Sequence, residues 1–144
     1  SSINKITEIG FTIIQLHGNE SLKRIKEIRS LTSLKIIKCF GIEDKVDLEK
    51  IKVYENEVDY FLFDAKPTKN ELPGGNAKIF EWASLNQYNF KKEFFLSGGL
   101  NSENIETAVN SNLTNFFDVS SGVESSPGVK DKQKISEFIN KIKN

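Results

Sequence analysis

Two short glycine- and serine-rich segments have the composition of a phosphate-binding site. Residues 97–101 read Ser-Gly-Gly-Leu-Asn, and residues 120–122 read Ser-Ser-Gly. Glycine lets the backbone approach a ligand closely, and free N–H groups at the start of a helix favour an anion. One glycine pair alone is also typical of a tight turn. Two such loops after successive strands favour phosphate binding. The residues expected to bind it are Gly98, Gly99, Ser121 and Gly122.

Two aspartates stand at the ends of apolar runs, where a side chain can reach a ligand. Asp64 ends the run 61–64, which reads Phe-Leu-Phe-Asp. A carboxyl group at that place could act as a general acid, and a capping or loop role is the open alternative. Asp118 lies two residues before Ser120. It could contact the same ligand or order the serine-rich loop.

His17 and Cys39 are the only histidine and the only cysteine. His17 follows a short apolar run in the segment Gln-Leu-His-Gly, and a structural role is favoured over a catalytic one. Cys39 lies inside an apolar run, where a buried and unreactive thiol is usual. The sequence offers no support for a metal site, and we expect no metal and no cofactor.

The elements that must position these residues follow from the apolar pattern. Five apolar runs have the length of strands: 11–16, 34–40, 58–63, 93–96 and 115–119. Because these runs are continuous rather than alternating, the strands should be covered on both faces. The sequence therefore predicts a parallel sheet of class α/β, with ligands at the carboxyl ends of the strands.

Helical patterns lie between the runs and carry capping residues. We expect one helix after Asn19, a second after Asn101 or Ser102, and a third behind Asp131. The third has the clearest pattern, because four apolar residues recur at helical spacing. They are Ile135, Phe138, Ile139 and Ile142.

Size and composition are those of one ordinary globular domain, which we expect to span residues 1–144. The chain has 20 basic and 20 acidic side chains, so its balance does not favour nucleic acid or a membrane surface as a partner. The single cysteine and the lack of a long apolar run favour a reducing, cytoplasmic setting.

Five segments together resemble the phosphoribosylanthranilate isomerase family in order and spacing. They are residues 15–20, 61–67, 72–76, 96–101 and 118–131. The resemblance implies a (β/α)8 TIM barrel of which this sequence supplies about the last five βα units, from the fourth to the eighth strand. It also implies the Amadori rearrangement of N-(5-phosphoribosyl)anthranilate, a phosphosugar, to 1-(2-carboxyphenylamino)-1-deoxyribulose 5-phosphate in tryptophan biosynthesis, without a cofactor.

The resemblance implies roles for single residues. Asp64 matches the family's general acid, and Asp118 matches the active-site aspartate on the last strand. Gly75, in the glycine-rich loop 74–77, matches a substrate-binding position. In that loop Ala77 stands where the family usually has glycine. The two glycine- and serine-rich segments match the family's phosphate loops.

Two features of the family have no match in this sequence. The family's general base is a cysteine in a Cys-Gly pair on the first strand, and Cys39 falls instead on the strand that matches the fifth. The arginine-bearing loop after the second strand has no match either. We therefore expect the chain alone to be inactive, with an N-terminal segment or another copy of the chain completing the barrel.

Two other interpretations stay open. One is a non-catalytic, phosphate-binding half-barrel that acts as a folding fragment or an interaction module. The other is a related phosphosugar barrel, such as the isomerase of histidine biosynthesis or indole-glycerol-phosphate synthase. The segments 15–18 and 118–131 argue against the latter.

Overall fold

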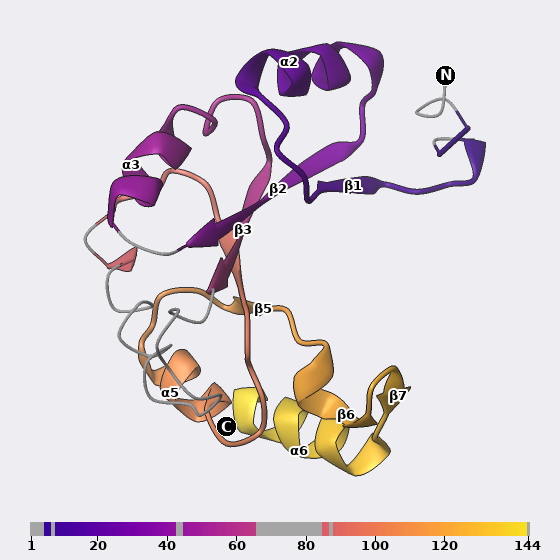
Figure 1. Cartoon of the computed structure of the whole chain (residues 1–144), viewed down its shortest axis with the longest axis vertical. Helices are drawn as coiled ribbons and strands as arrows, with labels where there is room; N and C mark the ends of the chain where they lie inside the picture. Colours follow the sequence, from indigo (N-terminus) through magenta and orange to yellow (C-terminus); the bar gives the residue numbers. More distant parts are fainter. Residues whose placement is uncertain (1–4, 7, 43–44, 66–84, 87, 144) are drawn as a thin grey trace.

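A five-stranded parallel sheet forms the centre of the computed structural model, which describes residues 5–6, 8–42, 45–65, 85–86 and 88–143 (Figure 1). The strands lie side by side in chain order. They are β1 (Ile13–Leu16), β2 (Lys35–Ile42), β3 (Tyr60–Ala65), β4 (Phe94–Ser97) and β5 (Phe116–Phe117). The predicted parallel sheet is confirmed, and each predicted apolar run contains one strand with ends shifted by a few residues.

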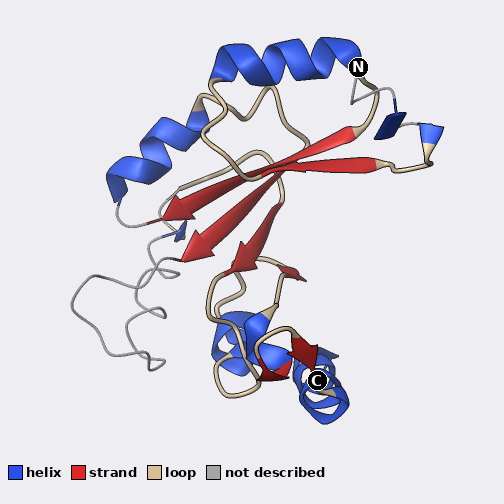
Figure 2. Ribbon diagram, turned by 45° about the vertical axis from the view of Figure 1, so that its right-hand side comes forward, coloured by secondary structure: helices blue, strands red, loops and turns tan. Residues whose placement is uncertain are grey.

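The helices pack on one face of this sheet. They are α2 (Leu22–Leu31), α3 (Lys45–Lys52), α5 (Ile105–Asn110) and α6 (Lys132–Lys143). Figure 2 shows α2 and α3 alongside the first strands, with α5 and α6 together at the other end of the strand order. Ile25 of α2, Leu48 of α3 and Ile105 of α5 are fully buried in one cluster with the strand residues of that face. In the described residues a helix follows β1, β2, β4 and β5, as an α/β barrel requires.

The ends of the helices show which capping predictions hold. The helix α2 begins behind Ser21, whose Oγ accepts a hydrogen bond from the Arg24 N–H at 3.2 Å, so the prediction of Asn19 as the cap was wrong. Asp131 caps α6 as predicted, because its Oδ1 accepts the N–H groups of Gln133 and Lys134 at 2.9 and 3.0 Å. Ser21 is the residue directly before the helix, where a side-chain oxygen reaches the first free N–H groups.

Some elements differ from the sequence-based expectations. Phe138 is buried as the helical stripe of α6 predicts, but Ile139 remains 42% exposed and lies outside that stripe. The pattern did not predict α3, nor the hairpin of β6 (Glu124–Ser126) and β7 (Val129–Lys130) that precedes α6. In the described parts of the chain, the helices are all too short or too polar to cross a membrane.

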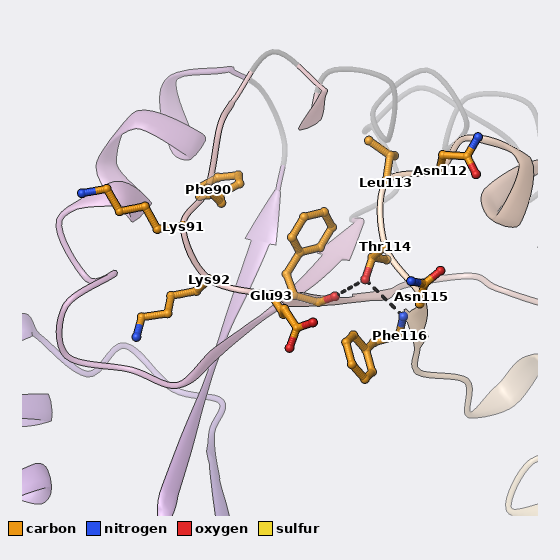
Figure 3. A pocket seen from close by; sticks show the side chains of 10 residues that line it. Phe90, Lys91, Lys92, Glu93, Asn112, Leu113, Thr114, Asn115 and Phe116 are labelled. Atoms are coloured by element: carbon orange, nitrogen blue, oxygen red, sulfur yellow. Dashed lines mark hydrogen bonds between the residues drawn. The ribbon is translucent and has the colours of Figure 1, made fainter.

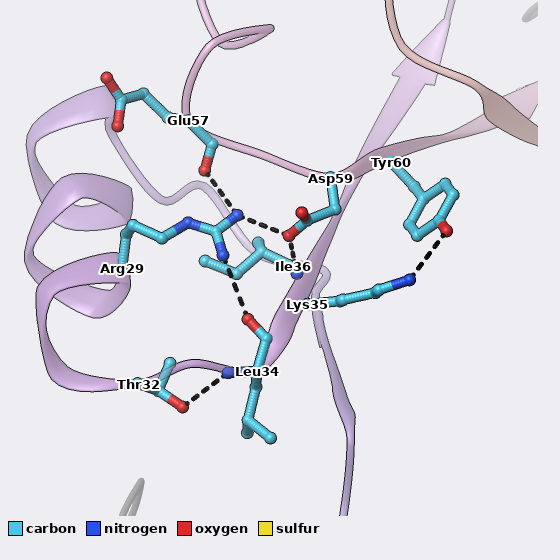
Figure 4. Close-up of polar contacts among 8 residues, drawn as sticks. All are labelled: Arg29, Thr32, Leu34, Lys35, Ile36, Glu57, Asp59 and Tyr60. Carbon is cyan, nitrogen blue, oxygen red and sulfur yellow. Dashed lines mark hydrogen bonds and ion pairs between the residues drawn. The ribbon is translucent and has the colours of Figure 1, made fainter.

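A hydrogen-bond network at the amino ends of the strands fixes α2 to the sheet (Figure 4). The Arg29 guanidinium donates to Asp59 Oδ2 at 2.6 Å and to the carbonyl oxygens of Leu34 and Glu57 at 3.2 and 3.3 Å. Asp59 Oδ2 also accepts the Ile36 N–H at 2.8 Å. One helix and two strands are thereby joined at the end opposite to the predicted site.

Candidate active site at the carboxyl ends of the strands

The register of the sheet places the two predicted aspartates in one row. Asp64 of β3 is paired with Ser97 of β4, and the Ser97 hydroxyl donates to Asp118 Oδ2 at 2.9 Å. The Asp118 N–H donates to the Leu96 carbonyl at 2.9 Å, which continues the pairing of β4 with β5. Residues in register on parallel strands have side chains on the same face. Three adjacent strands thus present a carboxyl, a hydroxyl and a second carboxyl group at one edge.

This row lies on the face of the sheet opposite to the helices. Alternate residues of β2 and β3 form a second, smaller cluster of Ile37, Cys39 and Leu62, separate from the helix-covered core. Asp64 follows Leu62 by two positions and is therefore on the same face. In a closed barrel this is the inner face, and its carboxyl end is where substrates bind.

A cavity of about 600 Å³ opens beside Asp64, between the ends of β1, β2 and β3. His17, Cys39 and Asp64 all line it, together with residues 18–21 after β1. The Gln15 side chain approaches His17 Nδ1 at 3.4 Å on the same face of the strand. The structure therefore brings His17 and Asp64 to one cavity, although they lie 47 positions apart in a chain of 144 residues.

Cys39 lies at this cavity but is a poor proton acceptor. The thiol is buried, and burial together with the negative charge of Asp64 raises the pKa of Cys39 from 9.0 to about 11. A thiol with this pKa stays protonated at neutral pH, so it has little nucleophilic or basic character. The prediction of a buried cysteine is confirmed, and its low reactivity stays a prediction that the raised pKa supports.

The loop after β4 turns through two left-handed glycines. Gly98 and Gly99 have φ values of 89° and 64°, which side chains with a Cβ rarely adopt. The buried Asn104 holds this loop, because its Nδ2 donates to the Gly99 carbonyl and its Oδ1 accepts the Asn101 N–H, both at 2.9 Å. The Asn101 side chain in turn accepts the Glu103 N–H at 2.9 Å and the Asn104 N–H at 3.1 Å, so Asn101 caps the turn that precedes α5. The helix itself begins at Ile105 behind Asn104, so the prediction of Asn101 or Ser102 as its cap was wrong.

The loop after β5 packs directly against the loop after β4. A Cβ placed on Gly122 would lie 1.8 Å from the Leu100 carbonyl oxygen, and real Cβ atoms essentially never come within 3.0 Å of another atom. Only glycine allows this approach. The two predicted phosphate loops are therefore in contact. Their role in phosphate binding stays a prediction.

Lys130 and Glu124 stabilise the serine-rich loop through a hydrogen bond and an ion pair. Lys130 Nζ donates to the Ser120 carbonyl at 2.9 Å and pairs with Glu124 Oε1 at 2.7 Å. The hydrogen bond from Lys130, aided by the Gly128 N–H, lowers the pKa of Glu124. These contacts close the β6–β7 hairpin within the segment 118–131.

Sequence reasoning missed Lys38, which lies within the run 34–40 that was taken as apolar. Its side chain is only 2% exposed and lies behind the loop that carries His17. A lysine inside a strand covered on both faces requires a buried anionic or carbonyl partner. The acidic residue Glu20, in the segment 15–20 that precedes this strand, could have indicated that Lys38 has a partner.

A second hollow, of about 440 Å³, lies at the opposite end of β4 and β5 (Figure 3). Its central polar group is Thr114, whose hydroxyl donates to the Phe94 carbonyl at 2.5 Å and accepts the Phe116 N–H at 3.1 Å. The first contact joins the start of β5 to β4, and the second is local to the segment that leads into β5. This end of a parallel sheet usually serves stability rather than catalysis.

One predicted site residue, Gly75, lies outside the described residues, as does Ala77. Among the residues that the structure describes, no three His, Cys, Asp or Glu side chains are placed to hold a metal ion.

Comparison with known proteins identifies the family. The family model of N-(5'-phosphoribosyl)anthranilate (PRA) isomerase matches residues 2–141. The N-(5'-phosphoribosyl)anthranilate isomerase of Rhizobium rhizogenes is 43% identical over 131 residues, which are 90% of this chain and 59% of the relative. That of Agrobacterium fabrum is 44% identical over 131 residues, 90% of this chain and 60% of the relative. The chain thus spans about three fifths of the length of these curated relatives.

Solved structures agree with this result. The phosphoribosyl anthranilate isomerase from Thermotoga maritima superimposes with a TM-score of 0.79 at 32% identity, over 99% of this chain and 69% of that one. Another structure of a phosphoribosyl anthranilate isomerase, in complex with reduced 1-(o-carboxyphenylamino)-1-deoxyribulose 5-phosphate, gives a TM-score of 0.77 at 28% identity, over 99% and 67% of the two chains. The five-stranded parallel sheet and its helices thus have the fold of part of a TIM barrel, and the chain belongs to the N-(5'-phosphoribosyl)anthranilate isomerase family.

Proposed function

We propose that this chain provides the proton donor and the phosphate site of an N-(5'-phosphoribosyl)anthranilate isomerase of tryptophan biosynthesis, working in the cytoplasm on a small phosphosugar substrate. The observation that carries the proposal is the row of Asp64, Ser97 and Asp118 beside two touching glycine loops. A relative of the same family binds a reduced form of the product. The same chemistry fits the groups on this edge.

Asp64 has the position of the acid. Its carboxyl group delivers a proton to the ribose ring oxygen as the bond from that oxygen to C1 breaks, which leaves a C1–nitrogen double bond. Removal of the proton from C2 then gives the enolamine, and its tautomer is the ketose product. The reaction is an isomerisation, so the proton given to the sugar is balanced by the proton removed, and no oxidant or reductant is needed.

We assign the group that accepts the C2 proton to a part of the barrel outside the described residues. Cys39 is a poor candidate, because its pKa is raised to about 11. The family's base is a cysteine on the first barrel strand, and the sheet described here matches later strands. We propose that further strands, from a preceding segment or from a second copy, supply the base and cover β1, where Ile13 is 43% exposed.

The phosphate group is proposed to lie between the loop of Gly98 and Gly99 and the loop of Ser121 and Gly122. The contact of Gly122 with the Leu100 backbone supports this placement, because two loops at this distance can direct N–H groups at one anion. Asp118, which accepts the Ser97 hydroxyl, is then available to a sugar hydroxyl next to the phosphate. Gly75 is proposed to contact the substrate from the loop after β3.

The test is Asp64→Asn in a polypeptide with the complete barrel. Turnover should fall at least about 100-fold, the usual effect of losing a general acid, while binding of the reduced product analogue is kept. Asp59→Asn is the matched control, because Asp59 lies at the opposite end of β3 and should leave turnover of the folded protein unchanged. Near-normal turnover in Asp64→Asn would remove the assignment, and phosphate binding without any turnover in the parent would favour the non-catalytic half-barrel.

A further inference from the structure

Lys38 of β2 is a buried ammonium group that the proposed reaction does not use. Its Nζ donates to the carbonyl oxygens of Gly18 at 2.6 Å and Cys39 at 3.0 Å, and the Leu16 carbonyl lies at 3.5 Å. Glu20 Oε2 lies at 2.9 Å and forms an ion pair with it. The Phe40 ring lies 4.9 Å away on the same side of the strand. Four oxygen atoms therefore surround one charge.

The hydrogen-bonding capacity of the Lys38 ammonium group is used largely by the loop after β1. An ammonium group has three protons, and the three shortest contacts are to Gly18, Glu20 and Cys39. Burial, the largest single effect, raises the pKa of Glu20, but the contact and charge of Lys38 together with the backbone N–H groups of Gly18 and Glu20 outweigh it, so the net pKa is lowered. Removing the lysine would leave a carboxylate and several carbonyl groups without their charge partner.

The contacts of Lys38 and Glu20 enclose the backbone around His17. The Leu16 carbonyl precedes His17, and the Gly18 peptide that follows it is held at both ends. Its carbonyl accepts from Lys38, and its N–H donates to Glu20 Oε1 at 3.1 Å. His17 and Asp64 line the same cavity, so a shift of this loop would move the imidazole relative to the carboxyl group.

We propose that Lys38 is a positioning residue of the substrate site: by binding the Gly18 carbonyl and the Glu20 carboxylate, it fixes the His17 imidazole at the cavity that Asp64 lines. The proposal rests on the proposed function for its catalytic consequence only. The positioning itself can be measured without turnover, because the imidazole NMR signals of His17, assigned by their loss in His17→Gln, report directly on the surroundings of this side chain.

The experiment uses the double variant Lys38→Met/Glu20→Gln in the complete barrel. Removing both charges avoids the unpaired buried carboxylate that Lys38→Met alone would leave, so the protein should still fold. We expect the His17 imidazole signals to move toward those of an unstructured peptide and amide exchange at Gly18 to speed up about tenfold. KM should rise about tenfold with little change in kcat, since a binding contact is misplaced and the acid is intact.

Two further variants make the result decisive. Lys26→Met is the matched control, because Lys26 pairs with Glu57 at 3.6 Å on the surface of α2, away from the cavity. Glu20→Gln alone keeps the lysine and its carbonyl partners, so it should shift the His17 signals and Gly18 exchange in the same direction by less. It decides the matter if the double variant is unfolded.

The possible outcomes separate this inference from the proposed function. If the His17 signals, Gly18 exchange and KM of the folded double variant equal those of Lys26→Met, Lys38 is not a positioning residue. If the parent protein shows no isomerase activity, the proposed function fails, and the signals of His17 and Gly18 still decide the role of Lys38.

Discussion

Gly122→Ala should separate the two loops that are proposed to hold the phosphate. The added Cβ would lie 1.8 Å from the Leu100 carbonyl oxygen and 3.0 Å from Asn101 Cα. The contact is with backbone rather than with a flexible side chain, so the loops themselves must move apart, by about 1 Å, a displacement large enough to disrupt a positioned ligand.

The magnitude follows from how firmly the opposing loop is held. Asn104 is 6% exposed and fixes both the Gly99 carbonyl and the Asn101 N–H, so the loop after β4 cannot easily give way. The free energy of unfolding should therefore fall by about 3 kcal/mol, the upper end of the usual cost of overpacking. Phosphate binding should weaken about 100-fold, since N–H groups of the two loops would no longer reach one anion together.

The assay is calorimetric titration of the complete barrel with the reduced product analogue and with anthranilate, beside urea unfolding. Gly128→Ala is the matched control: Gly128 has φ of 80° but no atom within 4 Å of an added Cβ, so it should cost about 1 kcal/mol from strain and leave binding intact. Equal loss of both ligands in folded Gly122→Ala, or undiminished binding of the phosphorylated one, would refute the reasoning.

Three other predictions concern charge, thiol chemistry and association. Partial burial, the largest single effect, raises the pKa of Asp59, but the hydrogen bonds from Arg29 and the Ile36 N–H together with the charge of Arg29 outweigh it, so the net pKa is lower than usual. The resulting stability, about 1 kcal/mol for this partly exposed pair, is therefore present above about pH 4 and lost as pH falls through the folded pKa. Urea unfolding at pH 7 and pH 3 should show a smaller pH dependence in Asp59→Asn than in the parent, and an equal one would contradict the role of Arg29. Cys39 should react with iodoacetamide at pH 8 about 100-fold more slowly in the folded than in the urea-unfolded chain. It should react faster in Asp64→Asn than in the parent, because the Asp64 charge helps to raise the pKa of Cys39. If that substitution has no effect on the rate, the two groups do not interact. The isolated 144-residue polypeptide should associate through the exposed side of β1 and lack isomerase activity, and an active monomer on size-exclusion chromatography would disprove this.

The sequence predicted what depends on continuous apolar character and missed what depends on single polar contacts. The five strands and the edge that carries Asp64 and Asp118 follow from apolar runs and from the rule that parallel strands end together. Ser21 rather than Asn19 caps α2 because capping requires a place directly before the first helical residue, and the apolar spacing leaves that place uncertain by a few residues. Asn104 escaped notice because an asparagine at the start of a helix looks like an exposed cap, whereas here it is buried between two turns of the same loop.

Lys38 shows how a polar residue inside a strand can reveal a site. The charged pairs at the two ends of this sheet differ in their exposure to solvent and in the elements that they join. At the amino ends, Arg29 and Asp59 are each about one third exposed and join elements that are already packed. At the carboxyl ends, Lys38 is fully enclosed and two of its partners, Gly18 and Glu20, belong to a partly exposed loop, so its desolvation cost is fully offset only while that loop keeps one conformation. The loop supplies hydrogen-bond acceptors to the buried lysine, and the lysine in turn restricts the conformations that the loop can adopt. On this proposal the strand beside it holds the segment after β1 in place, and His17 lines the cavity of Asp64 through that segment.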